Sequence, residues 1–507
     1  MMKKVLCILM AVAMVACLFA CTKAPVDTTT AGKTNVDNTT VANDPADDTT
    51  AAVDPLRAYE GTTLTFAHCQ GEYIWESFYK IGEAFEEKTG IKIEWKEIPN
   101  ADWETWVTAQ FSAGTEPDVI WMSNAGITKS FYDQGKVINL NNYINEPNAF
   151  NGIKWADCFT PGALSNCYSE DGKDLITLGI TYATVNLYAN LDIMKELGLG
   201  DKVPTTWSDM VDMMKVAKDN GKYVPMSVMN SMSWNLGWIE PDFMDSLFAG
   251  TDVVSKLDII TPNGTLDTPE LMLGLETGVI DYEDPRFVEY FKLMKDMTQY
   301  YNEDYNTASW EYESLFNDGK ALFNFNGGWF PGQVVEKGLT VNYAATQKPV
   351  IDKEFSQYGI DTGIAYAQSA GEPLFLVPQK TADEGKEGAA VLWMQFLTDY
   401  QSGAKMFIDA VMLESCIANI EYPEEMAALA DKTYGDAKNT NIQGAFKFCD
   451  EANGDFWPLY TEYLDPASTM SAEDFCKLLK DELMPYLEDA IDEYEHADIL
   501  SYVDQVG

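Results

Sequence analysis

The sequence predicts an α/β protein whose globular body has two halves. Strand-like and helix-like stretches alternate from Thr63 to Met122, and a β-α-β-α-β order predicts a mainly parallel sheet covered by helices. The body of about 450 residues is too long for one compact core and suits two lobes. A hydrophobic fraction of 46%, with 12% aromatic residues, indicates that this body is well packed.

The first 21 residues have the pattern of an export signal. Lys3 and Lys4 precede an apolar run of roughly 16 residues, which is short for a membrane span. The run ends in Leu18-Phe19-Ala20-Cys21, which resembles the lipobox of bacterial lipoproteins. That resemblance implies cleavage before Cys21, lipidation of Cys21 and an extracytoplasmic protein anchored to the cell membrane. Cys17 ends a weaker copy of the pattern, and an ordinary secretory signal or an uncleaved anchor is the alternative.

Residues 22–56 are predicted to form a disordered tether. They contain no aromatic residue and few large aliphatic residues, and Thr, Asp, Asn, Ala and Pro dominate the stretch. Such a composition cannot bury enough apolar surface to offset the entropy lost on folding. We expect the tether to lift the globular body off the membrane.

The charge of the chain argues against one class of partner. The net charge is −46, and the acidic residues are spread along the sequence rather than gathered in one tail. A surface of this sign repels phosphate backbones, so the sequence predicts no nucleic-acid binding. Solubility of an exposed protein is the simplest use of this charge.

The sequence offers no metal or cofactor motif. The two histidines, His68 and His496, are far apart, and none of the nine cysteines forms a CxxC pair or a zinc-like cluster. The motifs GxSxG, P-loop and HExxH are absent, so no cofactor and no catalytic residue is predicted. Two cysteine pairs could close short loops, with buried thiols as the alternative: Cys158 with Cys167, and Cys449 with Cys476.

The elements of the first half are predicted from the spacing of apolar residues and from a glycine that ends a helix. Residues 63–69 alternate and are rich in β-formers, which predicts a strand. Apolar residues near helical spacing predict a helix over 71–90, ended by a glycine. In such sheets ligands bind beyond the carboxyl ends of strands, here residues 68–70 and 121–124. The elements that follow the first helix are a strand over 91–98, a helix over 101–114 and a strand over 117–123.

Local signals also mark the next elements. A strand-like segment that ends near Tyr188 leads into a short helix closed by Gly198. The next helix begins after Pro204. We expect Thr206 to be its N-cap, with Asp209 three residues later.

The stretch "ESLFNDGKALFNFNGGWFPG", Glu313–Gly332, predicts a helix, a turn, a short strand and a glycine turn. Trp329 follows Gly327 and Gly328, which we expect to make the backbone pliable. A large aromatic residue at the mouth of a strand is well placed to meet a ligand, and a buried core tryptophan is the alternative.

Seven stretches in order resemble the solute-binding lipoproteins of bacterial ABC importers, the group that includes maltose-binding protein. They are "FEEKTGIKIEW", "FSAGTEPDVIWM", "DQGKVINLNNYI", "LYANLDIMKELGL", "PTTWSDM", "FNDGKALFNFNGGW" and "EPLFLVPQKTADEGKEGAAVLWMQFLT". Each is loose alone, but their order from about Thr63 to about Ile420, behind a lipobox and a tether, is specific. Residues 421–507 match nothing in the group and predict acidic helices, with core positions at Phe475, Leu478, Leu479, Leu483 and Leu487.

The resemblance implies a two-lobed α/β fold of the periplasmic-binding-protein type. Such a fold has a ligand cleft between the lobes and several chain crossings that act as a hinge. The resemblance places lobe 1 at 57–179 with part of about 376–418, and lobe 2 at 180–375 with part of about 419–507. The crossings are expected in three places: 178–182, 375–378 and 417–419.

The resemblance also nominates ligand-binding residues. Trp329, after the glycine turn, resembles a sugar-stacking platform, because the C–H face of a pyranose packs on an aromatic ring. Trp238 is expected to form a second aromatic wall with Trp234, and Ala125 and Gly126 do not reproduce the pattern of maltose-binding protein, which puts maltose in doubt. For each candidate, packing or local capping is the alternative. The other candidates lie on loops expected to face the same cleft: Gln70, Glu72, His68, Ser123, Asn124, Tyr182 and Trp234. Three tryptophans are expected in the core: Trp121, Trp207 and Trp393.

The function implied is that of the substrate-binding component of an ABC transporter. The lobes would close on an extracellular solute, most simply an oligosaccharide, and the closed form would deliver it to the permease subunits. One alternative is a ligand-sensing subunit for a membrane kinase. Another is a secreted glycoside hydrolase, whose carboxylate pair cannot be singled out among 80 acidic residues.

Overall fold

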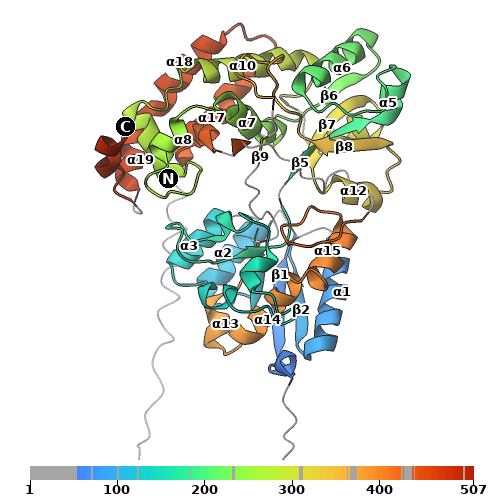
Figure 1. The fold of residues 1–507 in the computed structure, drawn as a ribbon, viewed down its shortest axis with the longest axis vertical. Helices are drawn as coiled ribbons and strands as arrows, with labels where there is room; N and C mark the ends of the chain where they lie inside the picture. Colours follow the sequence, from blue (N-terminus) through green and yellow to red (C-terminus); the bar gives the residue numbers. More distant parts are fainter. Residues whose placement is uncertain are drawn as a thin grey trace, which may run out of the picture. The chain divides into compact units, whose positions relative to one another are not determined.

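The computed structural model shows two α/β lobes, each built on its own mixed sheet (Figure 1). The residues that the structure describes are 54–69, 72–99, 102–122, 125–182, 184–230, 234–307, 312–361, 364–365, 374–423, 426, 437–438, 440–494 and 497–506. The signal predicted for residues 1–21 and most of the tether predicted for residues 22–56 lie outside this set, as does His496. The last tether residues are described, and a short 3-10 helix begins there (Pro55–Arg57), where disorder was predicted. Across the described part of the chain, we find no helix with the length and apolar character that a membrane crossing requires.

The sheet of the first lobe has the strand order β2-β1-β3-β10-β4. Its strands β1, β2 and β3 pair in parallel, as predicted, because helical crossovers connect them. The fourth, β10, joins from far along the chain and runs antiparallel to both β3 and β4. The strands are β1 (Thr63–His68), β2 (Lys92–Glu97), β3 (Val119–Met122), β4 (Leu178–Gly179) and β10 (Leu374–Leu376).

The first lobe combines helices that precede the second lobe in the sequence with helices that follow it. Helix α1 (Glu72–Thr89) packs against α15 (Gly403–Val411), although more than 300 residues separate them. The predicted core residues Trp121 and Trp393 are both buried here. The remaining helices of this lobe are α2 (Trp103–Ala113), α3 (Ala125–Asp133), α4 (Asn141–Ile144), α13 (Gln379–Asp383) and α14 (Glu387–Leu397).

The sheet of the second lobe has the strand order β6-β7-β5-β8. Strand β7 is parallel to β6 and antiparallel to β5, and β5 is antiparallel to β8. All seven residues of β7 are buried, which matches its reading as a short apolar strand. The strands are β5 (Val185–Asn190), β6 (Val224–Ser227), β7 (Ala321–Gly327) and β8 (Tyr343–Gln347).

The helices of the second lobe come from two parts of the chain. Thr206 caps α6 as predicted, its Oγ1 accepting from the Asp209 N–H at 3.2 Å, and Trp207 is buried behind it. The first group is α5 (Leu191–Glu196), α6 (Trp207–Asn220), α7 (Trp234–Leu247), α8 (Val253–Leu257), α9 (Thr268–Thr277), α10 (Pro285–Met297), α11 (Tyr312–Asn317) and α12 (Phe330–Glu336). The C-terminal group is α17 (Asp450–Leu464), α18 (Ala472–Leu483) and α19 (Leu487–Glu493).

The C-terminal helices complete the core of the second lobe. Phe475, Leu479, Leu483 and Leu487 are buried in the same apolar cluster as residues of α7, α9 and α10, and Leu478 packs against it. The apolar face predicted for this segment is therefore confirmed. Its partner is the second lobe rather than a separate domain.

Two stretches run side by side where the first lobe's sheet ends. Thr181 and Ser415 form an antiparallel bridge, and the Tyr182 N–H donates to the Glu414 carbonyl at 2.8 Å. Residues 375–378, where a crossing was expected, lie instead within and just after β10, in the first lobe's core. That core continues to Met426, and the second lobe's core resumes at Ile442.

The six cysteines of the described chain are not joined by disulfides. Burial raises the pKa of the Cys167 thiol to about 12 and also raises the pKa of Cys158. Both thiols are therefore protonated and unreactive at neutral pH. Cys158 and Cys167 are therefore buried thiols rather than a disulfide.

His68 sits in an aromatic cage in the first lobe's core. Its side chain is fully buried, and neither ring nitrogen has a hydrogen-bond partner among the described residues. The rings around it include Trp75, with a centroid distance of 5.0 Å, and Phe78, at 5.8 Å. Burial lowers the pKa of His68 to about 4, because an imidazolium cannot be solvated there.

The buried imidazole predicts a pH-dependent stability that can be isolated by difference. The unfolded chain takes up a proton near pH 6.5 and the folded chain only near pH 4. Stability from His68 is therefore complete above pH 6.5 and falls by about 3 kcal/mol towards pH 4. The measurement is urea unfolding from pH 4 to 7.5 of the wild type and of His68→Phe. Parallel curves of unfolding free energy against pH would contradict the assignment. Other titrating groups, such as Asp245, whose contribution has the opposite sign, are present in both proteins and cancel in the difference.

Candidate ligand-binding site

Trp329 is held by a turn that hydrogen bonds fix to β5. The turn follows β7 at Gly327, and Trp329 itself is the N-cap residue of α12. The Gly328 N–H donates to the Thr184 carbonyl at 2.9 Å, and the Tyr188 hydroxyl donates to the Gly327 carbonyl at 3.0 Å. The backbone under Trp329 therefore has a defined position.

The two glycines provide space rather than the pliability expected from the sequence. Neither has a positive φ. A Cβ on Gly327 would lie 2.2 Å from the Trp329 ring, and one on Gly328 would lie 2.7 Å from the Thr184 Oγ1. The indole of Trp329 thus folds back onto the Gly327 backbone, which only glycine permits.

Trp329 meets a second tryptophan. Its ring and that of Trp238 make an edge-to-face pair, with centroids 5.7 Å apart and an interplanar angle of 79°. Both rings are half-buried, and Trp329 also packs against the core of the first lobe. The geometry thus brings together two of the aromatic residues that the sequence nominated.

A third tryptophan packs on the same turn of α7. Trp457, from α17, lies over Gly237, whose Cβ would be 3.2 Å from the Trp457 ring. Gly237 directly precedes Trp238, so Trp329 and Trp457 both pack at the turn of α7 that carries Trp238. We call Trp329, Trp238 and Trp457 the tryptophan row.

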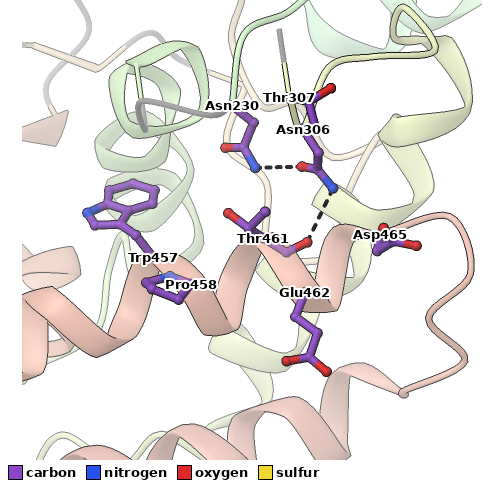
Figure 2. Close-up of a pocket in the computed structure, with 8 residues that line it drawn as sticks. All are labelled: Asn230, Asn306, Thr307, Trp457, Pro458, Thr461, Glu462 and Asp465. Carbon is purple, nitrogen blue, oxygen red and sulfur yellow. Dashed lines mark hydrogen bonds between the residues drawn. The ribbon is translucent and has the colours of Figure 1, made fainter.

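A pocket of about 560 Å³ begins beside Trp457 (Figure 2). Asn230 and Asn306 form its polar wall, with the Asn230 Nδ2 donating to the Asn306 Oδ1 at 2.8 Å. The Asn306 Nδ2 in turn donates to the Thr461 carbonyl of α17 at 3.2 Å. Asn230 is 2% exposed and its Oδ1 has no hydrogen-bond partner in the described chain.

The pocket lining carries acidic but no basic side chains. Glu462 and Asp465 belong to the lining, and Pro458 extends the apolar side next to Trp457. An aromatic ring beside amides, a hydroxyl and carboxylates suits a solute with C–H faces and hydroxyl groups. Among the described residues, no group of His, Cys, Asp and Glu side chains could hold a metal ion.

Two predicted site residues turn out to be packing residues in this structure. His68 is enclosed by aromatic rings, as described above, and reaches no surface. Tyr182 is 6% exposed, and its hydroxyl is hydrogen-bonded to the Thr160 Oγ1. Burial raises the pKa of Tyr182 to about 12, so the phenol stays neutral. Both side chains are buried in this structure, and their role in ligand binding stays a prediction.

The other predicted residues lie where the structure gives no side-chain description. Glu72 and Trp234 begin α1 and α7, respectively, and only their backbone is described. Their role in ligand binding stays a prediction, as it does for three residues outside the described part of the chain: Gln70, Ser123 and Asn124. Lipidation of Cys21, which also lies outside it, stays a prediction too.

Sequence reasoning missed Trp457, Asn230 and Asn306. Asn230 follows β6. Because ligands bind beyond the ends of strands, this position could have nominated Asn230 from the sequence. Asn306 lies in a turn with no motif. Trp457 stands in "FWP", within a segment that resembled nothing, and only the folded structure shows that it faces α7.

Comparison with known proteins identifies the family. Residues 80–428 match the family described as bacterial extracellular solute-binding protein. The match spans more than half of the chain, so the protein belongs to this family and is a solute-binding protein rather than an enzyme. No curated protein sequence matches this chain.

Solved structures share the fold at low identity. RafE in complex with raffinose is 17% identical, with a TM-score of 0.59, and the alignment covers 84% of this chain and 99% of that one. A maltose-bound MalE3 from T. maritima is 17% identical, with a TM-score of 0.55 and coverages of 83% and 99%. A chitin oligosaccharide binding protein is 14% identical, with a TM-score of 0.57 and coverages of 85% and 98%.

The close contact at Gly327 predicts a large cost for one added methyl group. Gly327→Ala should destabilise the protein by about 1–3 kcal/mol and displace the Trp329 ring, because the new Cβ overlaps it. Gly454→Ala is the matched control. Gly454 lies exposed within α17 with open space around it, so alanine should stabilise by up to about 1 kcal/mol. Urea unfolding of both variants, with tryptophan fluorescence, checks the pair, and equal effects would contradict the packing argument.

Proposed function

We propose that this protein is the substrate-binding component of an ABC importer and that its solute is a carbohydrate. The observation that carries the proposal is the tryptophan row beside a pocket lined by amides and carboxylates. Pyranose rings present C–H faces that pack on indoles. Their hydroxyls donate to acceptors such as the carboxylates of Glu462 and Asp465, which line the pocket.

The ligands of similar structures support the same class. Structures with this fold include RafE in complex with raffinose, a maltose-bound MalE3 and a chitin oligosaccharide binding protein. At 14–17% identity these names do not transfer residue by residue. The ligand class that they indicate agrees with the chemistry of the tryptophan row, which supports a carbohydrate independently.

The domain arrangement that we propose makes ligand capture a hinge motion. Lobe 1 takes residues 57–179 and the segment from Leu374 to about Met426, and lobe 2 takes the rest of the body. The paired stretches at Thr181 and Ser415, with Thr184 next to Gly328, would be the hinge. Because Trp329 sits beside the hinge, a ligand that contacts it only in the closed form would favour closure.

We further propose that Cys21 carries a lipid and that residues 22–56 tether the body near its permease. The support is the lipobox-like Leu18–Cys21 and the composition of the tether. The closed protein would dock on the permease subunits, and ATP would be hydrolysed by another subunit.

Removing the Trp329 ring should weaken carbohydrate binding without unfolding the protein. A thermal-shift panel of mono- and oligosaccharides, polyamines, amino acids and short peptides identifies the ligand class, since binding to the native state raises Tm. For the sugar that binds, Trp329→Ala should raise Kd by about 10-fold. Tyr59→Ala, an exposed aromatic before β1, is the control and should leave Kd unchanged. A panel in which only non-sugars bind would reject the carbohydrate proposal.

The lipid anchor can be tested by a paired cysteine exchange. Cys21→Ala should abolish incorporation of a labelled fatty acid and release the protein from the membrane fraction. Cys17→Ala should leave both unchanged, because Cys17 ends the weaker copy of the motif. Labelling that survives Cys21→Ala would refute the assignment.

A further inference from the structure

Helix α7 carries the centre of the tryptophan row and is interrupted just after it. Pro241 lies inside the helix, four residues after Gly237. A proline has no N–H, so the Gly237 carbonyl loses its helical donor, and the proline ring crowds that turn. The turn of α7 that carries Trp238 therefore lacks one backbone hydrogen bond.

A buried lysine from another element contacts this turn. Lys348 follows β8 directly, and its Nζ donates to the Trp238 carbonyl at 2.9 Å. The same Nζ lies 2.7 Å from the Asp242 Oδ2. The side chains of Lys348 and Asp242 are 11% and 4% exposed, so solvent scarcely screens the pair.

The shift of the Asp242 pKa shows that Lys348 must offset the cost of burying this carboxylate. Burial raises the pKa of Asp242 to about 6, and the charge of Lys348 acts in the opposite direction. The Asp242 Oδ1 has no hydrogen-bond partner in the described chain. An apolar pair of similar volume would serve packing equally well, so stability alone does not explain a lysine here.

We propose that Lys348 is a positioning residue for the ligand site, which holds the Trp238 carbonyl and thereby sets the edge-to-face contact of Trp238 with Trp329. Asp242 balances the charge of the lysine, and β8 anchors its backbone to the sheet. The proposal rests on the proposed function in so far as the tryptophan row binds the solute. Its structural half, the placement of Trp238, does not need a ligand.

Three variants separate positioning from stability. Lys348→Met removes the donor and leaves a buried carboxylate alone, so it should lower Tm as well as alter the site. Lys348→Met combined with Asp242→Leu removes both charges, and Tm should return to near the wild-type value. Asp242→Asn is the matched control, because it removes the ion pair but keeps the lysine donor to Trp238.

The first readout is near-UV circular dichroism of the ligand-free protein. The double variant should change the tryptophan bands, whereas Asp242→Asn should keep them. In a Trp238→Phe background the change should vanish, which assigns it to Trp238. Unchanged bands in the double variant, or a change that persists without Trp238, would overturn the proposal.

The second readout is affinity for the sugar that the panel identifies. The double variant should bind it about 10-fold more weakly at matched Tm, while Asp242→Asn binds as the wild type does. Affinity that follows Tm across the three variants would mean a purely structural role and would overturn the proposal. If no sugar binds the wild type, the carbohydrate function fails, and the circular dichroism alone decides whether Lys348 positions Trp238.

Discussion

The close approach of the Trp329 indole to the Gly327 backbone is the contact on which the candidate site depends. It requires a residue without a side chain at the end of β7, and it directs the ring towards α7. The hydrogen bonds from Tyr188 and to Thr184 then fix the turn to β5. Because Thr184 lies two residues after Tyr182, whose N–H donates to Glu414, the ring is tied to the segment that joins the lobes. The packing of Trp329, the proposed hinge and the proposed ligand surface are therefore connected through this turn.

Much of the fold could be predicted because its signals are local. The strand–helix alternation from β1 to β3, the cap at Thr206 and the apolar face around Phe475 each depend on residues close in sequence. The entry of β10 into the first sheet could not be predicted in this way, since it depends on contacts with strands more than 190 residues away. The candidate site likewise combines a residue with a local sequence signal and a residue that only long-range packing places. Trp329 has a local signal in its glycines, whereas Trp457 acquires its position only through packing on Gly237.

The acidic character of the chain has two different meanings. Most of its acidic residues suit a solvated surface, as the net charge of −46 suggested. Helix α7 instead buries Glu240, Asp242 and Asp245, and burial raises the pKa of Asp245 to about 7. Lysines from outside the helix reach two of them, with Lys447 2.5 Å from Glu240. Composition alone cannot separate these groups, because the difference is in the folded environment and not in the residue type.

The two-part core of the second lobe has a consequence for the order in which the protein folds. Its apolar cluster joins residues 187–351 to residues 442–499, with the whole return through the first lobe in between. A chain emerging from its N-terminus can form most of the first strands early, but the second core stays open until the last helices have been delivered. Long-range contacts of this kind slow folding and leave apolar surface exposed meanwhile. A chain cut short before α17 would therefore be a target for aggregation and proteolysis, not a smaller working receptor.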